Sequence, residues 1–545
     1  MAQEVLPSDY DIIILGTGTT ECILAAAFAR VGYKVLHMDR NDYYSGDWAT
    51  FHFKALRDWT RRYNQPVLEP SFDTDRDSLL LDGEQLIPLE INGTNIHDVS
   101  EQIFVKEKSE PTENDAEASE VDTESTGNTL KQNETDQSQE ENNDSINTDD
   151  GDKPLMAVHK ESPDSEKGEK TWTLELFEEQ WRKFNIDLMP KILYCRGLMV
   201  ELLISSDVAK YCEFRTVTRV LTMIDAKLQQ VPCSRSDVFS SKQVSMIEKR
   251  MLMKFLTFAV DYESHHEEYE GYEDRPYVEF LRSKNLSPNV LHYILHAIAM
   301  VTEATPTTEG LKNTQRFLQS LGRYGNTAFL WPLYGASDLL QCFCRVQGVI
   351  NTQGQRLKTR QITLLSLPPP SGSRHPITVL ELSSLSMACP SGLYVVHLTC
   401  ETVRDAKSDL IPAVQSLYHW SADGSSDVSK PSVLWSLFFN MTDTREIVQT
   451  RNLPTNLFVV GGPDGGLDFE HSIDEAKRLF QSLCPDEEFL PKAPNPEDII
   501  FDDGDNVTNK ESGFEGESQT EEDLNNAENE AREAKKANEE NPDTE

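Results

Sequence analysis

The sequence has little positive charge. Its 545 residues include 51 Lys and Arg against 92 Asp and Glu, a formal net charge of −41. A protein that binds duplex nucleic acid needs a basic surface to neutralise phosphates, and a protein that docks on anionic lipid also needs basic residues. The composition therefore predicts no nucleic acid partner and no direct electrostatic contact with a membrane.

Long apolar runs are also missing. The apolar run Ile12–Leu15 has four residues, whereas a signal peptide needs about 7–15. No stretch approaches the ~20 apolar residues of a membrane span. The nine cysteines are an odd number without the spacing of a disulfide framework or a zinc finger. We expect reduced thiols, no metal site and a cytosolic protein.

The acidic charge is concentrated in two segments. Residues 109–152 contain 15 acidic residues and one Lys, and residues 502–545 contain 16 acidic and four basic residues. These 88 residues carry −26 of the −41. Such segments bury too little apolar surface to offset chain entropy, which predicts disorder.

A strand–helix–strand unit opens the chain. An apolar strand ends at Gly16 and Gly18, a helix rich in alanine covers Cys22–Arg30, and a second strand ends at Asp39. Asp39 lies 21 residues after Gly18, where a dinucleotide site places the acid that binds a ribose. This pattern predicts an α/β fold with a Rossmann-like, FAD-binding-type multi-strand domain, accompanied by a second, mainly helical domain.

The third glycine of the dinucleotide loop is replaced by Glu21. Its carboxylate stands at the helix N-terminus, where a pyrophosphate would bind. We therefore expect a degenerate loop (Gly16, Gly18, Glu21 and Asp39) that binds no cofactor, in a fold retained as scaffold. A working FAD or NAD site in an oxidoreductase is the alternative. The sequence contains no other catalytic motif that would assign an activity.

Hydrophobic patterns place further elements along the chain. A capping box of Ser472 and Glu475 is expected at the start of the last helix. The patterns predict helices over Asp187–Leu203, Ser241–Val260 and Pro288–Thr302, and strands over Leu393–Leu398, Val433–Phe439 and Leu457–Val460.

Several motifs together resemble the Rab GDI and Rab escort protein superfamily. They are Gly16–Cys22, His37–Gly46, Phe184–Leu188, Ile247–Phe255, Leu321–Asn326 and Asn495–Ile500. Within the superfamily, Gly46–Phe51, the acidic insert and Val231–Phe239 are similar to the escort proteins. The resemblance covers the chain from Asp11 to Asp502 apart from the acidic insert.

The resemblance implies a non-catalytic function. An escort protein is the accessory component of Rab geranylgeranyltransferase. It binds an unprenylated, GDP-bound Rab GTPase, presents the Rab C-terminal cysteines to the catalytic alpha–beta heterodimer, and escorts the geranylgeranylated Rab to membranes. It needs no cofactor, and it meets the membrane only through the lipid on the Rab. A GDI-like Rab recycling factor is the alternative within the superfamily.

The resemblance also implies three groups of site residues and a lipid-accepting groove among the helices. The Rab platform would be Tyr43, Tyr44, Glu248, Lys249 and Lys254. The transferase contact would be Phe239 with Arg250. The Rab-tail patch would be Arg323, Tyr324, Phe329, Leu330, Pro332, Leu333 and Tyr334.

The chain departs from the pattern of the family after Arg345. The family continues with a Gly-Gly-x-Tyr-x-Leu stretch and further strands, whereas here Val346–Ile350 leads within ten residues to Arg360–Leu364. We therefore expect a shortened C-terminal part.

The predicted division is 1–104 (Rossmann-like domain, first part), 105–170 (acidic disordered insert), 171–240 (helical domain), 241–345 (return to the main domain, with the Rab-binding helix and tail region), 346–501 (C-terminal strands and helix) and 502–545 (acidic disordered tail).

Overall fold

The computed structural model of the chain describes residues 9–63, 95–105, 172–232, 237–238, 245–344, 362–370, 373, 375–420, 430–444 and 454–493. All of them lie in one unit of the chain, Met1–Ala493. The predicted acidic tail and residues 106–170 of the predicted insert lie outside the described residues, and so does Phe239.

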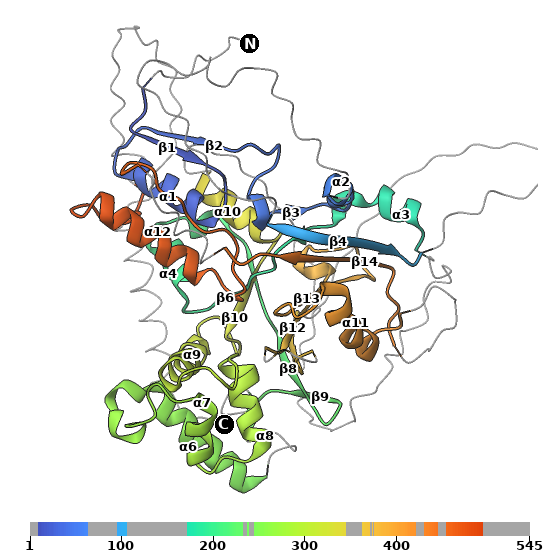
Figure 1. Ribbon diagram of the computed structural model, residues 1–545, viewed down its shortest axis with the longest axis vertical. Coiled ribbons are helices and arrows are strands. Elements are labelled where there is room, and N and C mark those ends of the chain that lie inside the picture. Colours follow the sequence, from blue (N-terminus) through green and yellow to red (C-terminus); the bar gives the residue numbers. More distant parts are fainter. Residues whose placement is uncertain are drawn as a thin grey trace, which may run out of the picture. The chain divides into compact units, whose positions relative to one another are not determined.

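The first elements form the predicted strand–helix–strand unit. β1 (Ile12–Leu15) and β2 (Val35–Met38) pair in parallel, and α1 (Thr19–Arg30) connects them (Figure 1). The alanines of α1 allow α10 (Ala336–Cys344) and α12 (Glu470–Leu483) to pack closely against it. Nine of its twelve residues are buried, so α1 is an internal helix rather than an amphipathic surface helix.

A five-stranded sheet forms the second part of the fold, in the order β13-β12-β11-β8-β9. Its strands are β8 (Arg219–Ile224), β9 (Lys227–Gln230), β11 (Thr363–Leu367), β12 (Ile377–Ser383) and β13 (Tyr394–Thr399). Only β8 and β11 pair in parallel. Because parallel neighbours require a long crossover connection, the chain between them has room for a whole group of helices.

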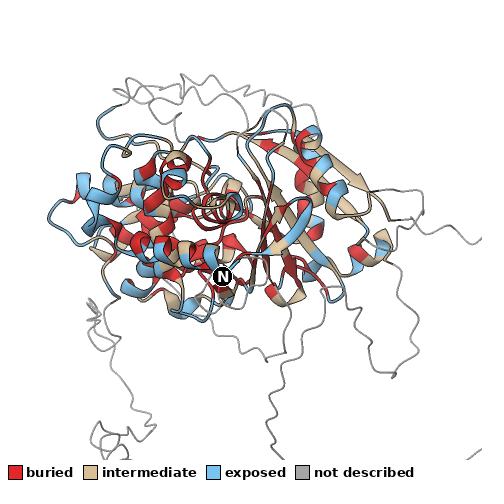
Figure 2. Ribbon diagram, turned by 90° about the horizontal axis from the view of Figure 1, so that it is seen from below, coloured by how far each residue is buried: buried red, intermediate tan, exposed pale blue. Residues whose placement is uncertain are grey.

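That helix group is α6 (Met246–Val260), α7 (Tyr277–Ser283), α8 (Pro288–His292), the π-helical turn η8 (Tyr293–Ile298) and α9 (Thr307–Ser320). The helices share one core with the face of β8, β11 and β12 that carries Val220, Leu364 and Leu380. α11 (Ala406–Leu417) covers the other face of this sheet. Buried residues gather on the strands and on the inner sides of the helices (Figure 2).

Short elements connect these parts. β6 (Leu193–Tyr194), β10 (Phe329–Pro332) and β7 (Phe214–Thr216) form one sheet with β10 in the middle. The remaining elements are η1 (Gly46–Trp48), β3 (Thr50–Phe51), α2 (Phe53–Tyr63), β4 (Ile96–Ile103), α3 (Leu174–Glu179), η4 (Trp181–Lys183), β5 (Ile186–Asp187), α4 (Leu198–Ser205), η5 (Ala209–Tyr211), η6 (Tyr262–Ser264), η7 (His266–Glu268), η10 (Ser384–Ser386) and β14 (Trp435–Met441).

An aromatic cluster packs α2 and α3 together. The rings of Phe53, Phe177 and Phe184 have centroids 5.1, 5.4 and 5.6 Å apart. All three side chains are buried, and burial of such a ring stabilises the fold by about 2 kcal/mol. β4 pairs with β14 beside this cluster, so Trp435 also contacts Phe53.

The structure confirms three predicted elements. α6 lies inside the predicted helix Ser241–Val260, and its capping box is formed by Ser245 and Glu248. β13 and β14 match the strands predicted over Leu393–Leu398 and Val433–Phe439 to within two residues at each end.

Four other predictions are wrong. The predicted helix Asp187–Leu203 is instead β5, β6 and then α4, because this stretch is buried on all sides and its apolar spacing does not distinguish a helix from strands. The predicted helical segment 171–240 is accordingly rich in strands, and the helix group lies after residue 245. Residues Leu457–Val460 form no strand, and Ser472 is buried inside α12 rather than capping it.

We predict that Gly335→Ala destabilises the fold strongly. Gly335 has a φ of +90°, and a Cβ there would lie 2.4 Å from Asp187 Oδ1 and 2.6 Å from the Thr50 side chain. We expect the free energy of unfolding to fall by about 3 kcal/mol. Gly322→Ala is the matched control, because Gly322 has a φ of +86° with nothing within 4 Å. Urea denaturation followed by circular dichroism should show the larger loss for Gly335→Ala, and equal losses would contradict the close approach.

Candidate functional site

The side chain of Glu21 fills the glycine-rich loop before α1. A Cβ at Gly18 would lie 2.5 Å from Oε2 of Glu21, and one at Gly16 would lie 3.1 Å from its Oε1. Burial raises the pKa of Glu21 to about 7, although a backbone hydrogen bond opposes the rise. The carboxyl group thus lies in the loop before α1, where the phosphates of a dinucleotide would bind.

Asp39 has a structural role at the end of β2. It accepts a hydrogen bond from Thr17 Oγ1 at 2.5 Å and one from the backbone N–H of Asn41 at 2.8 Å. Thr17 Oγ1 in turn accepts from the N–H of Ser45 at 2.7 Å, and the Ser45 hydroxyl lies 2.9 Å from that of Ser337. These bonds hold the turn after β2 between the glycine loop and α10.

This turn carries the two tyrosines of the predicted Rab platform. Tyr44 is 53% exposed, whereas the ring of Tyr43 packs edge-on against Phe51 at 4.9 Å. Tyr44 therefore presents its ring to solvent from a backbone that is fixed by hydrogen bonds. The sequence motif did not indicate that α10 lies beside this turn, because Ser337 follows Ser45 by 292 residues.

The charged residues of α6 do not form one face. Arg250 and Lys254 are exposed, but Lys249 is buried at 7% exposure. Consecutive residues of a helix point about 100° apart, so a charged triplet cannot lie entirely on one side. Glu248 completes the cap of the helix by accepting from the Ser245 N–H at 2.8 Å. α6 packs against α9, whereas the turn that carries Tyr44 is bonded to α10.

The predicted Rab-tail patch is mostly interior, because four of its residues are buried in this structure. Phe329, Leu330, Pro332 and Leu333 are buried because β10 is the central strand of its sheet. Phe329 faces Tyr194 and Phe317, with ring centroids 4.8 and 5.6 Å away.

The other members of the predicted patch lie at its edge. Tyr324 and Tyr334 are 44% and 42% exposed. Arg323 donates to the Cys195 carbonyl at 2.9 Å and pairs with Glu201 at the start of α4. Its guanidinium therefore links two segments of the fold.

An ion network joins the helix group to α12. Arg316 on α9 contacts Asp468 Oδ2 at 3.1 Å and Glu470 Oε2 at 2.5 Å. Its guanidinium also lies 4.0 Å from the ring of Tyr194. Burial lowers the pKa of Arg316, but Tyr194 and the two acids outweigh it and raise the pKa above its usual value. The cation thus has partners on three sides.

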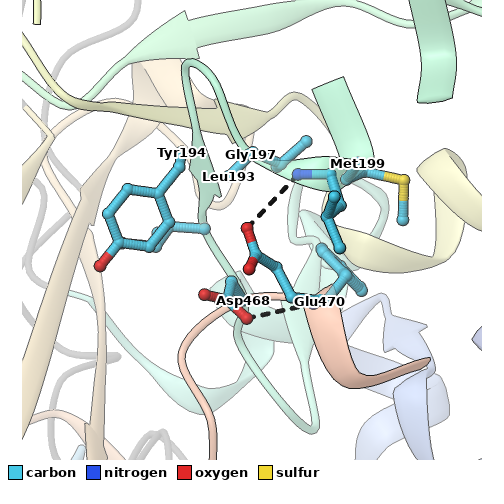
Figure 3. A pocket seen from close by; sticks show the side chains of 9 residues that line it. Leu193, Tyr194, Gly197, Met199, Asp468 and Glu470 are labelled. Atoms are coloured by element: carbon cyan, nitrogen blue, oxygen red, sulfur yellow. Dashed lines mark hydrogen bonds between the residues drawn. The ribbon is translucent and has the colours of Figure 1, made fainter. Parts of the chain in front are cut away.

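The same acids line a small pocket at the start of α4 (Figure 3). Glu470 accepts a hydrogen bond from the Leu198 N–H at 3.3 Å, and its own N–H donates to Asp468 Oδ1 at 3.1 Å. The pocket is lined otherwise by apolar side chains such as Met199 and Leu193. Its polar groups are occupied with one another, which makes it a structural junction rather than a ligand site.

A second buried cation holds the loop that leads into α12. Lys191 is fully buried and donates to Asp464 Oδ1 at 2.6 Å and to the Asp464 carbonyl at 3.1 Å. It also bonds the Gly466 carbonyl and lies 5.1 Å from the Trp48 ring. The ring of Trp48 stacks on Phe469 at 5.5 Å.

No group of three or more His, Cys, Asp or Glu in the described residues could hold a metal ion. No described helix is long and apolar enough to cross a membrane.

Comparison with known proteins defines the family. Residues 5–87 and 169–361 match the family model described as GDP dissociation inhibitor, and residues 348–465 match RAE1/2 domain I, C-terminal region. A crystal structure of Rab GDI from Plasmodium falciparum has the same fold, with a TM-score of 0.50 at 16% identity over 88% of this chain and 99% of that one. The chain belongs to the GDP dissociation inhibitor family.

Curated relatives place the chain within that family. Rab proteins geranylgeranyltransferase component A 1 of Rattus norvegicus is 35% identical, over 91% of this chain and 94% of the relative. Component A 2 of Mus musculus is 35% identical, over 92% and 99%. The Rab GDP-dissociation inhibitor of Saccharomyces cerevisiae is 24% identical, over 64% and 56%. The chain therefore belongs to the component A proteins, which are the Rab escort proteins.

The alignment also bears on the length of the chain. It runs over 633 positions with the rat relative, whereas this chain has 545 residues. At least 88 aligned positions of the relative thus have no counterpart here. This difference agrees with a chain that is shorter than its family pattern.

We predict that Arg316→Leu costs about 2–3 kcal/mol of unfolding free energy, because Asp468 and Glu470 would keep their positions without a cation. Arg61→Leu is the control, since it removes an ion pair with Asp58 whose side chains are 56% and 44% exposed. Exposed pairs of this kind contribute about 0–1 kcal/mol. The measurement is the urea midpoint of each variant, and a loss for Arg316→Leu no larger than that for Arg61→Leu would overturn the proposed role of the network.

We predict that the free energy of unfolding falls less between pH 5 and pH 8 in Glu21→Gln than in the unmodified chain. Burial raises the pKa of Glu21 from 4.5 to about 7, so its contribution is present below pH 4.5 and is lost as the pH rises through 7. The full effect is at most about 3 kcal/mol. Glutamine stays neutral, so the urea midpoint of the variant should change less over this range. Glu267→Gln, which changes an exposed residue, is the control and should keep the original pH dependence. The same pH dependence in Glu21→Gln would show that the Glu21 carboxylate is solvated.

Proposed function

We propose that the chain is the non-catalytic escort component of a Rab geranylgeranyltransferase. It binds unprenylated, GDP-bound Rab GTPases, presents their C-terminal cysteines to the catalytic alpha–beta heterodimer, and carries the geranylgeranylated Rab to membranes. The observation that carries this proposal is the 35% identity to component A proteins over 91% of the chain. The family name itself assigns these relatives to one component of the transferase.

The glycine loop supports a role without a cofactor. We propose that β1, α1 and β2, whose two strands pair in parallel, form a Rossmann-like unit of the FAD-binding type in which Glu21 lies in the glycine loop. The Glu21 side chain occupies the space beside Gly16 and Gly18 that a pyrophosphate would need, whether or not its carboxyl group is ionised. A flavin absorbance spectrum of the purified chain separates this proposal from an FAD-dependent oxidoreductase, which would show stoichiometric bound flavin.

Tyr44 is the best supported residue of the Rab platform. It is exposed on a turn that Thr17, Asp39 and Ser45 hold in place, and an exposed aromatic side chain on a rigid backbone suits a binding hot spot. Tyr43 supports this turn from its inner side. We propose Glu248 and Lys254 as further Rab contacts, and Lys249 as a buried support beneath them.

The start of α6 supports the transferase contact. Arg250 is exposed there, beside Met246 and Ile247, which are 62% and 72% exposed. Two exposed apolar side chains next to an arginine form the kind of surface that is enriched in protein interfaces. We propose that Phe239 and Arg250 bind the transferase. Tyr324 and Tyr334 are the members of the Rab-tail patch that can reach a ligand in this conformation.

The acidic segments and the compartment also remain proposals. The GDP dissociation inhibitor model leaves residues 88–168 unmatched, which supports an inserted segment at 105–170. We propose that the insert and the tail 502–545 are disordered, and that the other residues form the Rossmann-like and helical parts. A cytosolic location, with membrane contact only through the lipid on the Rab, follows from the proposed function.

We predict that the full chain stimulates prenylation of a purified Rab. The assay contains the catalytic heterodimer, geranylgeranyl diphosphate and GDP-bound Rab, with and without this chain. Lipid transfer should require the chain, because the proposed function of the chain is to hold the folded Rab for the catalytic heterodimer. A GDI-like recycling factor would bind Rab without supporting transfer, and absence of both activities would refute the proposal.

Two substitutions should separate the two interfaces. Phe239→Ala should raise the dissociation constant for the transferase by about 30-fold, as expected for a hot spot of about 2 kcal/mol, and should leave Rab binding unchanged. Tyr44→Ala is the reciprocal variant and should weaken Rab binding alone. Isothermal titration calorimetry measures both partners for each variant. An unchanged transferase affinity in Phe239→Ala would show that the contact lies elsewhere.

A further inference from the structure

Two cysteines meet beneath the glycine loop. The Sγ of Cys22, in the first turn of α1, lies 3.4 Å from the Sγ of Cys344, the last residue of α10. They are 322 residues apart in the sequence, and both thiols are free. A disulfide requires about 2.05 Å between the sulfurs, so a small side-chain movement would bring them to bonding distance.

The surroundings of the pair favour a thiolate on Cys344. The hydrogen bond between the Cys344 and Cys22 sulfurs lowers the pKa of Cys344 most, burial opposes the change, and His37 lowers the pKa further, to about 5. Burial lowers the pKa of His37, but its hydrogen bonds to Cys344 and to the Gly16 carbonyl outweigh this and raise the pKa. A histidine beside a cysteine sulfur, as His37 lies beside Cys344, resembles the arrangement that activates cysteines in enzymes.

The two sulfurs differ in their exposure to solvent. Cys22 is 1% exposed, whereas Cys344 is partly exposed. A small oxidant can therefore reach Cys344 first, and Cys22 stands behind it as the second thiol. Cys400 is also partly exposed, but burial raises its pKa to about 11, so it stays a thiol and reacts slowly.

We propose that Cys344 and Cys22 form a peroxide-reactive dithiol site, with Cys344 as the attacking sulfur and Cys22 as the resolving one. The Cys344 thiolate attacks one oxygen of hydrogen peroxide, which forms an S–O bond, breaks the O–O bond and releases hydroxide that takes up a proton from His37. The Cys22 sulfur then attacks Cys344, which forms the S–S bond, breaks the S–O bond and releases a second hydroxide, protonated by the proton that Cys22 loses. The two sulfurs lose two electrons in total, and peroxide is reduced to two waters.

The disulfide would join α10 to α1. Ser337 at the other end of α10 contacts Ser45 in the turn that carries Tyr44, and the Ala336 N–H donates to Asp187. The site therefore links the oxidation state of the chain to the segment that supports the proposed Rab platform. The dithiol chemistry itself does not depend on that proposed function.

The test uses the full chain and hydrogen peroxide. After graded oxidation, free thiols are blocked with iodoacetamide, and the chain is digested without reduction and analysed by mass spectrometry. We expect a linked peptide pair that contains Cys22 and Cys344. It should form at peroxide concentrations that do not oxidise Cys400, so that Cys400 is recovered in the alkylated form. Oxidation of Cys400 before Cys344, or absence of the linked pair while Cys344 is oxidised, would overturn the proposal.

Three variants assign the roles. Cys22→Ser should leave a sulfenic acid on Cys344 that dimedone traps, and Cys344→Ser should abolish oxidation of Cys22. Cys400→Ser is the matched control and should form the linked pair as the unmodified chain does. The alkylation rate of Cys344 in the unmodified chain gives a readout that requires no variant, since it should reach its plateau below pH 7. A rate that still rises above pH 8 would contradict the thiolate at this site.

Discussion

The ion network around Arg316 is the contact on which the arrangement of the other parts depends. It joins α9, in the helix group, to Asp468 and Glu470 at the start of α12, while Glu470 also accepts from the first turn of α4. Removal of one partner from such a network leaves a charge without compensation, so every member must be in place. α12 also packs on α1, so a helix that begins at Glu470 completes the burial of the first strand–helix–strand unit.

Lys191 imposes a similar constraint on the loop before α12. A lysine without solvent exposure is stable only when acceptors surround it, and here the backbone and carboxylate of Asp464 and the Gly466 carbonyl supply them. The Asp464 carboxylate and the carbonyls of Asp464 and Gly466 thus bind Lys191. These bonds hold the glycine-containing loop in place before α12. Glu21 has the corresponding effect at the first glycine loop.

The positions of the predicted site residues depend on contacts of this kind. Tyr44 is exposed on the turn after β2, where Asp39 accepts hydrogen bonds from Thr17 and Asn41. The apolar run at Phe329–Pro332 belongs to the predicted Rab-tail patch, and its position between β6 and β7 places it in the core. Lys249 differs from its neighbours only by helical rotation, which a linear motif does not display. Each difference arises from the side of an element on which a residue lies.

The sequence by itself determined the first strand–helix–strand unit, the strands β13 and β14, the helix α6 and the family, because each depends on local periodicity or on motifs of adjacent residues. It also indicated that Glu21 is incompatible with a phosphate loop. Only the tertiary structure decided that Glu475 bonds Thr20 and the Gly461 N–H instead of capping its own helix. The same holds for the meeting of Cys22 with Cys344. Contacts between residues hundreds of positions apart depend on which buried charges find partners and which apolar faces pack together in three dimensions. Local spacing in the sequence does not contain this information.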